Sequence, residues 1–395
     1  MHRNLNMKRI LFYHNLDPWY GYSVINGLSR FAETRKDWKI QSTGFGMWPN
    51  RFPLNKWNGD GIILMIANQE TYDIINSKAI PFVNLTVWPN VPNVVPDHRK
   101  AGAMGAEYFI KKGFRHFAFC KHSDSNYGEQ QYLGFKDKLQ EYSYSCNKIQ
   151  IDVPKKRDGS EEASLLKTLE NHLKQLKLPV AMMTSNDHMA VFVNNAAHKI
   201  GINIPNQIAL LGVYNEPIGK ITSPSISSIE LNGEEAGFHA AKLLDQLMNG
   251  ERTTNKPPQI LIPPLRIIER NSTKSYAYND PSMGAVIEYI KQHANAQINI
   301  ELLLPIVNMS RRTLERRFLK ETGTTLWRAI RNHQIEQIKS LLVSTHWPIK
   351  QIAQKSAFHQ PSRMIQVFRE ETHETPLNFR KRYRNVDDQS RPAKP

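Results

Sequence analysis

Cysteine is almost absent from this sequence, and so are the motifs by which many enzymes are identified. Its two cysteines, Cys120 and Cys146, are too few for a disulfide framework and have no metal-ligand spacing. No GxGxxG follows a predicted strand, and the GxxxxGK[ST], HExxH and CxxC patterns are missing. No nucleophile–base arrangement stands out among the scattered His and Asp residues. We therefore expect a protein that is not an enzyme and that uses neither a metal ion nor another cofactor.

Long hydrophobic runs are also missing. No segment is apolar enough over the length that a membrane-spanning helix needs. The start of the chain, "MHRNLNMKRILFYHNLDPW", reaches a polar break before it builds the apolar core of a signal peptide. These two features predict a cytoplasmic protein without a membrane partner.

Positive charge is what the sequence has in excess. The 395 residues, enough for two or three domains, include 52 Lys and Arg against 36 Asp and Glu, a net charge of +16. Residues 272–395 carry 20 Lys and Arg against 11 Asp and Glu, so more than half of the excess lies in under a third of the chain. This concentration predicts a basic C-terminal module with a polyanionic partner.

Residues 7–270 alternate short apolar runs with helical patterns. Runs that are apolar at nearly every position suit parallel strands covered on both faces, and their repetition predicts a doubly wound α/β fold. Ligands of such folds bind beyond the carboxyl ends of the strands. The predicted strands are "RILFYHN" (9–15), "DGIILMI" (60–66), "PFVNLTV" (81–87), "HFAFCKH" (116–122), "VAMMTS" (180–185) and "IALLGVY" (208–214).

The pattern changes near residue 270. Residues 271–282 are rich in Ser, Thr and Asn with little apolar periodicity, so we predict a linker there. Residues 283–384 show helical periodicity and no strand pattern, which predicts an all-α domain. The polar tail 385–395 is expected to fray.

A helix-turn-helix is predicted around "MSRRTLERRFLKETG" (309–323). The stretch 299–309 predicts a first helix, Asn308 can adopt a left-handed turn, and Ser310 is a good N-cap for a second helix. In that helix Leu314 and Phe318 share one face. Arg312, Thr313 and Arg316 lie on the opposite face. A solvated charged surface is the alternative reading of one such helix.

The same arrangement is predicted a second time. Helices are expected at 348–358 and 359–371, with Ile349, Ile352 and Ala353 inward in the first of them. Met364, Ile365 and Phe368 are expected inward in the second, and Ser362, Arg363 and Gln366 outward. A long amphipathic helix at 326–345 joins the two units. Trp327 and Phe379 are assigned to the core. Two basic units of this kind make the solvated-surface reading much weaker.

Residues 283–384 resemble the DNA-binding domain of AraC-type transcription regulators over its whole length. The resemblance implies double-stranded DNA as the partner, with both second helices in successive segments of the major groove. It places base-facing residues at Arg312, Glu315 and Arg316, and again at Ser362, Arg363 and Gln366. The matching stretches are "MSRRTLERRFLKETG", "IEQIKSLLVST", "PIKQIAQKSAF" and "VFREETHETPLNFRKR".

Arginine can hold guanine through O6 and N7, which favours Arg312 and Arg316 as base readers, with phosphate contact as the alternative. Arg311 and Arg317 are expected to contact phosphates or to remain solvated. The family usually has glycine where Ala357 and His373 stand.

Residues 7–273 resemble the LacI/periplasmic sugar-binding type of sensor domain. The resemblance implies two α/β lobes, a sugar bound between them, and dimerisation through this domain. The order of the modules, sensor first and AraC-type domain last, is similar to that of the xylose operon regulators. The matching stretches are residues 94–120, 180–216, 223–244 and 263–273.

Candidate sugar-binding residues follow predicted strands. Carboxylates and amides bind sugar hydroxyls, and aromatic faces cover the C–H side of the ring. Asp187 and Asn215 are the polar candidates, with helix capping and a turn role as their respective alternatives. Trp19 and Tyr20 follow the first strand as aromatic candidates. Asp97 matches a family position but also suits a helix cap.

Together these features predict a sugar-responsive, DNA-binding transcription regulator that controls genes of pentose or related carbohydrate use. The expected partners are operator DNA, a small sugar effector and a second copy of the chain, with RNA polymerase as a further candidate. The alternative is a cytoplasmic sugar-binding receptor whose basic domain binds another polyanion, or DNA without sequence preference.

Overall fold

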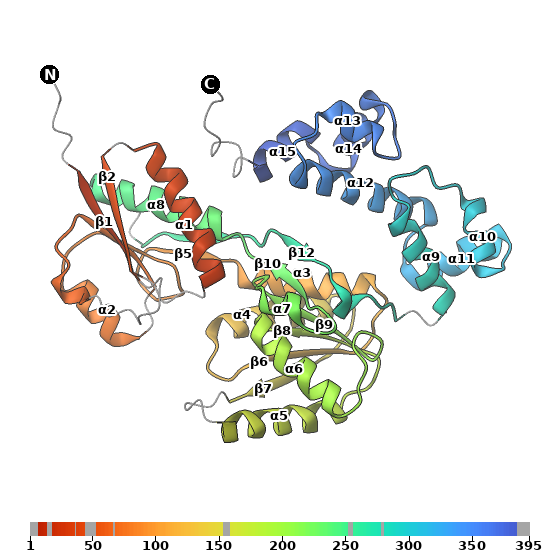
Figure 1. Ribbon diagram of the computed structural model, residues 1–395, viewed down its shortest axis with the longest axis horizontal. Coiled ribbons are helices and arrows are strands. Elements are labelled where there is room, and N and C mark those ends of the chain that lie inside the picture. Colours follow the sequence, from red (N-terminus) through yellow and green to blue (C-terminus); the bar gives the residue numbers. More distant parts are fainter. Residues whose placement is uncertain are drawn as a thin grey trace. The chain divides into compact units, whose positions relative to one another are not determined.

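The computed structural model of the protein describes residues 7–13, 18–35, 37–43, 53–65, 68–152, 159–251, 256–277 and 280–384. The chain divides into two compact units, shown with their elements in Figure 1. The N-terminal unit comprises residues 1–110 and 115–274, and the C-terminal unit comprises residues 111–114 and 275–395. Within the described ranges, no helix combines the length and the apolar character needed to cross a membrane.

The first lobe of the N-terminal unit is built on a parallel sheet with the strand order β11-β5-β4-β3-β1-β2. Helices α1 and α8 pack side by side, and they approach so closely that a Cβ at Gly27 or Gly237 would meet backbone atoms. The strands are β1 (Lys8–Tyr13), β2 (Trp38–Thr43), β3 (Gly61–Leu64), β4 (Phe82–Asn84), β5 (Asn93–Pro96) and β11 (Gln259–Ile262). The helices are α1 (Pro18–Glu33), η1 (Leu54–Lys56), α2 (Gln69–Asn76) and α8 (Gly233–Met248).

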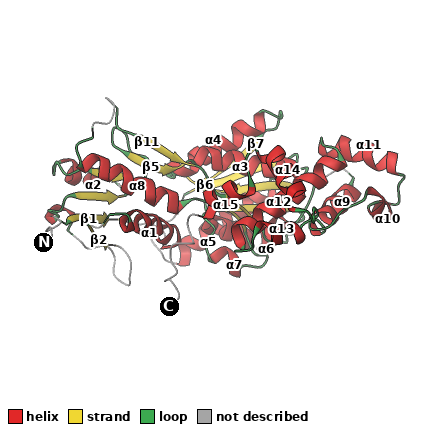
Figure 2. Ribbon diagram, turned by 90° about the horizontal axis from the view of Figure 1, so that it is seen from above, coloured by secondary structure: helices red, strands yellow, loops and turns green. Residues whose placement is uncertain are grey.

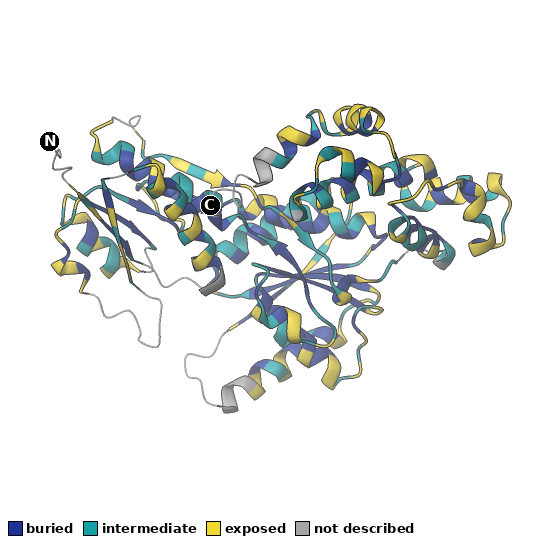
Figure 3. Ribbon diagram, turned by 45° about the horizontal axis from the view of Figure 1, so that its top comes forward, coloured by how far each residue is buried: buried dark blue, intermediate teal, exposed yellow. Residues whose placement is uncertain are grey.

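The second lobe has a sheet with the order β12-β10-β9-β8-β6-β7, in which only the β10–β12 pairing is antiparallel. Its central strands β8 and β9 are buried at every position, as their colour in Figure 3 shows. The strands are β6 (Phe117–His122), β7 (Cys146–Ile151), β8 (Val180–Thr184), β9 (Ile208–Val213), β10 (Ser227–Glu230) and β12 (Arg266–Ile268). The helices are α3 (His98–Lys111), α4 (Asn126–Gln140), α5 (Gly159–Lys174), α6 (Asp187–Lys199), α7 (Ile218–Ile221) and η2 (Asn271–Thr273).

The predicted fold class is confirmed. Each predicted strand overlaps a strand of the structure, and the two sheets form the two expected lobes. The strands that went unpredicted include the edge strands β2 and β7. These have few buried positions, one in β2 and two in β7, and therefore lack the continuous apolar run of a central strand.

The C-terminal unit contains helices, coloured red in Figure 2, and no strand in the described residues 280–384. The long helix α12 supplies Leu326, Ala329 and Ile330 to one hydrophobic core. Its later turns supply Ile338 and Leu342 to a second core. One helix therefore holds two helix-turn-helix units together. The elements are α9 (Pro281–Gln292), η3 (Ile300–Leu302), α10 (Leu304–Val307), α11 (Arg311–Thr322), α12 (Leu326–Ser344), α13 (Ile349–Gln354), α14 (Pro361–Thr372) and α15 (Pro376–Arg384).

Candidate functional site

The second helix of the first helix-turn-helix, α11, has both of its ends set by local sequence. Asn308 adopts the left-handed conformation, with φ of 47°, and so ends α10. The Ser310 hydroxyl then accepts a hydrogen bond from the Thr313 backbone N–H at 3.3 Å, which caps the new helix. Gly323, with φ of 70°, ends it. The predicted turn at Asn308 and cap at Ser310 are confirmed.

One face of α11 is core and the opposite face is open. Leu314 and Phe318 are completely buried. Arg312 and Arg316 are exposed, and neither has an ion-pair or hydrogen-bond partner among the residues that the structure describes. Two guanidinium groups one helical turn apart are therefore available to an external acceptor.

Three other charged residues of α11, Arg311, Glu315 and Arg317, already have partners. The Arg311 Nε donates to Glu315 Oε1 at 3.0 Å, four residues along the helix. Arg317 donates to Asp280 Oδ2 at 3.1 Å, which ties α11 to the start of α9. Hydrogen bonds from Ser282, together with the Arg317 guanidinium, lower the pKa of Asp280 below its usual value. Arg311, Glu315 and Arg317 thus stabilise the helix in addition to any contact with DNA.

In the second helix-turn-helix, α14 likewise has one buried face and one exposed face. Met364, Val367 and Phe368 form its buried face. Ser362, Arg363 and Gln366 are all exposed on other faces. The helix begins at Pro361, and its N-cap Gln360 makes no side-chain cap, unlike Ser310 in the first unit.

Two core assignments made from the sequence are wrong. Ile365 is 36% exposed, because Val367 takes the inward position next to Phe368. Trp327 is 59% exposed, because Leu326, Ala329 and Ile330 form the inward face of α12 and Trp327, about 100° around the helix from Leu326, lies beyond the edge of that face. Phe379 is buried, as predicted.

The turn before α14 places its left-handed residue at His359, with φ of 57°, while Ala357 is buried and does not adopt this conformation. His373, with φ of 60°, ends α14 at the position equivalent to Gly323. A left-handed conformation is costlier for histidine than for glycine, by about 1 kcal/mol.

In the N-terminal unit, Asp187 is the most deeply buried candidate for effector binding. It is not the N-cap of α6, because the Asn186 side chain accepts the Met189 N–H at 2.7 Å. Asp187 Oδ2 accepts the Glu216 N–H at 2.6 Å, and Oδ1 has no hydrogen-bond partner among the described residues. Oδ1 packs against Gly212, where a Cβ would come within 1.9 Å of it. A larger residue at that position of β9 would have to displace the Asp187 carboxyl group.

The environment of Asp187 disfavours its charged form. Burial raises the pKa of this carboxyl group from 3.8 to about 7, and the nearby Glu216 carboxylate adds to the increase. The Ser228 hydroxyl, the Glu216 N–H and the Arg270 guanidinium offset part of the effect. Asp187 can therefore change its protonation state near neutral pH.

Asn215 adopts the left-handed conformation, with φ of 56°, in agreement with its alternative reading as a turn residue. Its Nδ2 donates to Glu230 Oε1 at 2.9 Å, and its Oδ1 accepts a hydrogen bond from Arg270. Arg270 also donates to the Ile226 carbonyl at 2.6 Å. Both ends of the Asn215 side chain are thus engaged within the second lobe, where they hold the loop after β9.

Tyr214 is a feature that the sequence reading missed. Its φ of 92° is rare for a residue with a large side chain. Its ring meets the rings of Tyr20 and Tyr127 edge to face, with centroids 5.8 and 6.0 Å away. Tyr20 lies in the first turn of α1 and is buried, so this contact joins the two lobes. The place of Tyr214 at the end of a predicted strand could have marked it as a candidate, because ligands of such folds bind beyond the carboxyl ends of strands. The side chain of Trp19 lies outside the described residues.

Polar groups near the N-termini of α3, α4 and α6 lie next to this aromatic cluster. The Asn186 Nδ2 donates to the Tyr127 hydroxyl at 3.0 Å. His98, at the start of α3, lies 5.7 Å from the Tyr127 ring and 3.4 Å from the Gln131 amide. Burial lowers the pKa of His98 to about 4, so this imidazole is neutral at physiological pH. The buried Gln131 Oε1 has no hydrogen-bond partner among the described residues.

Asp97, the remaining candidate, lies just before α3. Its Oδ1 accepts the Lys100 N–H at 2.9 Å, which is the capping role that was the alternative for this residue. Of the other groups, Tyr127, Asn186 and Tyr214 follow the carboxyl ends of β6, β8 and β9. Tyr20 follows β1 and His98 follows β5, both in the first lobe. Aromatic faces next to neutral donors and acceptors suit a polar, uncharged molecule with several hydroxyl groups.

Two family models match the chain. A periplasmic binding protein-like domain matches residues 106–273, and a helix-turn-helix domain matches residues 304–382. The second match contains both α11 and α14.

Known proteins are similar to the chain along almost its full length. The xylose operon regulatory protein of Escherichia coli strain K12 is 25% identical over 387 residues, which cover 94% of this chain and 96% of that protein. The protein of the same name from Haemophilus influenzae is 25% identical over 388 residues, with coverages of 94% and 98%. A solved structure of a xylose-binding transcription activator shares the fold, with a TM-score of 0.60, 24% identity and coverages of 95% and 98%. These similarities include both units in the same order.

Proposed function

We propose that this chain, an AraC-type transcription regulator with an N-terminal periplasmic binding protein-like sensor domain, binds operator DNA through α11 and α14 in response to a sugar. The observation that carries the DNA-binding part is the pair Arg312 and Arg316. Both guanidinium groups are exposed opposite the buried Leu314 and Phe318. A helix with a core face and two free arginines on the other can enter the major groove and bind guanine there.

The effector that we propose is a pentose or a related neutral sugar. The similarity to xylose operon regulatory proteins supports this class. So does the cluster around Tyr214, in which aromatic rings lie beside the Asn186 amide and the Tyr127 hydroxyl. A sugar that binds one arrangement of the lobes more tightly shifts the population toward it, by no more than its difference in affinity. We expect a cytoplasmic homodimer, with RNA polymerase as a further candidate partner.

We expect Arg312→Ala and Arg316→Ala to relax specificity at particular base pairs. Losing a two-pronged contact with guanine costs about 1–3 kcal/mol of discrimination against the wrong base. The full-length protein and each variant would select sequences from a randomised duplex pool. The expected result is a motif in which the variants lose the preference for G at one position each.

Arg311→Ala serves as the matched control on the same helix, because Arg311 is paired with Glu315. It is expected to weaken binding about equally for all sequences and to reduce the slope of log affinity against log salt. If Arg312→Ala and Arg316→Ala behave like this control, both arginines contact phosphates only. If the unaltered protein selects no motif, the regulator proposal itself fails.

The sugar is expected to stabilise the N-terminal unit against heat. A ligand at 100 times its dissociation constant adds about 2.7 kcal/mol. For a domain of this size, that corresponds to a rise in Tm of roughly 5–10 °C. Thermal unfolding would be followed with a panel of pentoses, hexoses, uronic acids and disaccharides, with sugar alcohols as controls. A selective rise for one sugar identifies the effector, whereas no rise with any of them contradicts the sugar proposal.

A further inference from the structure

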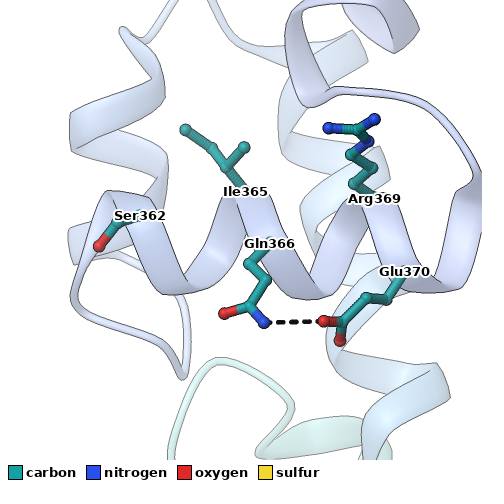
Figure 4. Close-up of a pocket in the computed structure, with 5 residues that line it drawn as sticks. All are labelled: Ser362, Ile365, Gln366, Arg369 and Glu370. Atoms are coloured by element: carbon teal, nitrogen blue, oxygen red, sulfur yellow. Dashed lines mark hydrogen bonds between the residues drawn. The ribbon is translucent and has the colours of Figure 1, made fainter.

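The exposed face of α14 carries an apolar side chain among polar ones. Ser362, Ile365, Gln366 and Arg369 follow one another at spacings of three, one and three residues, which places them along one side of the helix. With Glu370 they line an open groove of about 480 Å³, shown in Figure 4. This groove therefore lies on α14, the second helix of the second helix-turn-helix.

Ile365 does not contribute to the hydrophobic core of its own domain. The core below α14 is filled by Met364, Val367 and Phe368, all of them buried. Ile365 remains 36% exposed and points to the groove. An apolar group on a recognition surface is suited to the only apolar group that the major groove displays, the 5-methyl group of thymine.

The neighbouring Gln366 is held in place by its own helix. Its Oε1 accepts a hydrogen bond from Arg363 at 3.1 Å. Its Nε2 donates one to Glu370 at 2.8 Å, drawn as the dashed line in Figure 4. A side-chain amide has two donor hydrogens and two acceptor lone pairs. One donor and one acceptor site therefore remain, and these are the two that a glutamine uses to bind adenine at N7 and N6.

We propose that α14 reads A·T base pairs, with Ile365 against the methyl group of thymine and Gln366 on adenine. The guanidinium groups of Arg363 and Arg369, on either side along the helix, add positive charge next to the DNA phosphates. This proposal rests on the proposed DNA-binding function and gives the two recognition helices different roles. The arginines of α11 favour guanine, so the operator is expected to contain one segment with G·C pairs that α11 reads and one with A·T pairs that α14 reads.

Sequence selection with the full-length protein tests this assignment. The unaltered protein is expected to enrich a motif with A·T positions beside the G-containing positions read by α11. Ile365→Ala is expected to lose the thymine preference at one position and to keep the G positions. Ile221→Ala, the same change at an exposed residue of α7, is the matched control and is expected to select the unaltered motif.

Two failures of this selection have different meanings. If the unaltered protein enriches no motif, the proposed regulator function is wrong. If it enriches a motif that Ile365→Ala selects unchanged, the function stands and the role of Ile365 is wrong.

A second measurement alters the DNA and not the protein. Replacing the thymine at that position by deoxyuridine removes only the methyl group. The unaltered protein is expected to lose roughly fourfold in affinity, the effect of about one buried methyl group. Ile365→Ala is expected to bind both duplexes equally. Equal binding of both duplexes by the unaltered protein would overturn the proposal without depending on how well any variant folds.

Discussion

Phe318→Ala is expected to destabilise the C-terminal unit by about 3–5 kcal/mol and to abolish specific DNA binding. Phe318 is completely buried in the core that α9, α10, α11 and the start of α12 share. Removing its ring leaves a cavity beneath the helix that carries Arg312 and Arg316. The measurement is urea unfolding of the full-length protein, followed by probes in each unit. The N-terminal unit is expected to unfold as before, because its cores contain no residue of this cluster.

Leu319→Ala, one position further along α11, is the control for this prediction. Leu319 is 49% exposed, so its truncation is expected to change the free energy of unfolding by no more than about 0.5 kcal/mol. A loss below 1 kcal/mol in Phe318→Ala would show that Phe318 does not anchor the recognition helix. A similar loss in Leu319→Ala would show that burial does not set the effect, and helix propensity could not explain it either, because alanine is the best helix former.

Asp187→Asn is expected to change how stability depends on pH. The Asp187 pKa is about 7 in the folded protein and 3.8 in the reference state, so between these values the folded chain holds a proton that the unfolded chain has released. The protonated Asp187 carboxyl group therefore makes its full contribution to the free energy of unfolding below pH 4, and this contribution is lost as the pH rises through 7. Relative to the variant, the native protein should lose up to about 4 kcal/mol across this range.

Urea unfolding of both proteins at pH 4.5 to 8.5 measures this difference. The asparagine keeps an oxygen for the Glu216 N–H and does not titrate, so it isolates the contribution of the carboxyl group. The difference between the two proteins is expected to level off above about pH 7. Parallel stability curves for the two proteins would mean that Asp187 ionises normally in the folded state.

Local sequence was enough to predict much of the recognition surface. The turn at Asn308, the cap at Ser310 and the buried pair Leu314 and Phe318 depend on residues within a few positions of one another. Such features follow from helical periodicity and from the hydrogen bonds that helix ends need. The same periodicity did not place Ile365 or Trp327, because either of two neighbouring apolar residues can face inward until the packing of other helices selects one.

The sequence by itself determined the α/β architecture of the N-terminal domain, the all-α C-terminal domain and the basic face of α11, since continuous apolar runs and helical spacing specify burial element by element. The division into two lobes was implied by the family resemblance. Only the tertiary structure decided how Tyr20, Tyr127 and Tyr214 meet and how Asp187 comes to lie against Gly212. These residues come from α1, α4, α6 and the end of β9. No local pattern links positions so far apart, because only the order of strands in the sheets and the packing of helices on them bring such residues together.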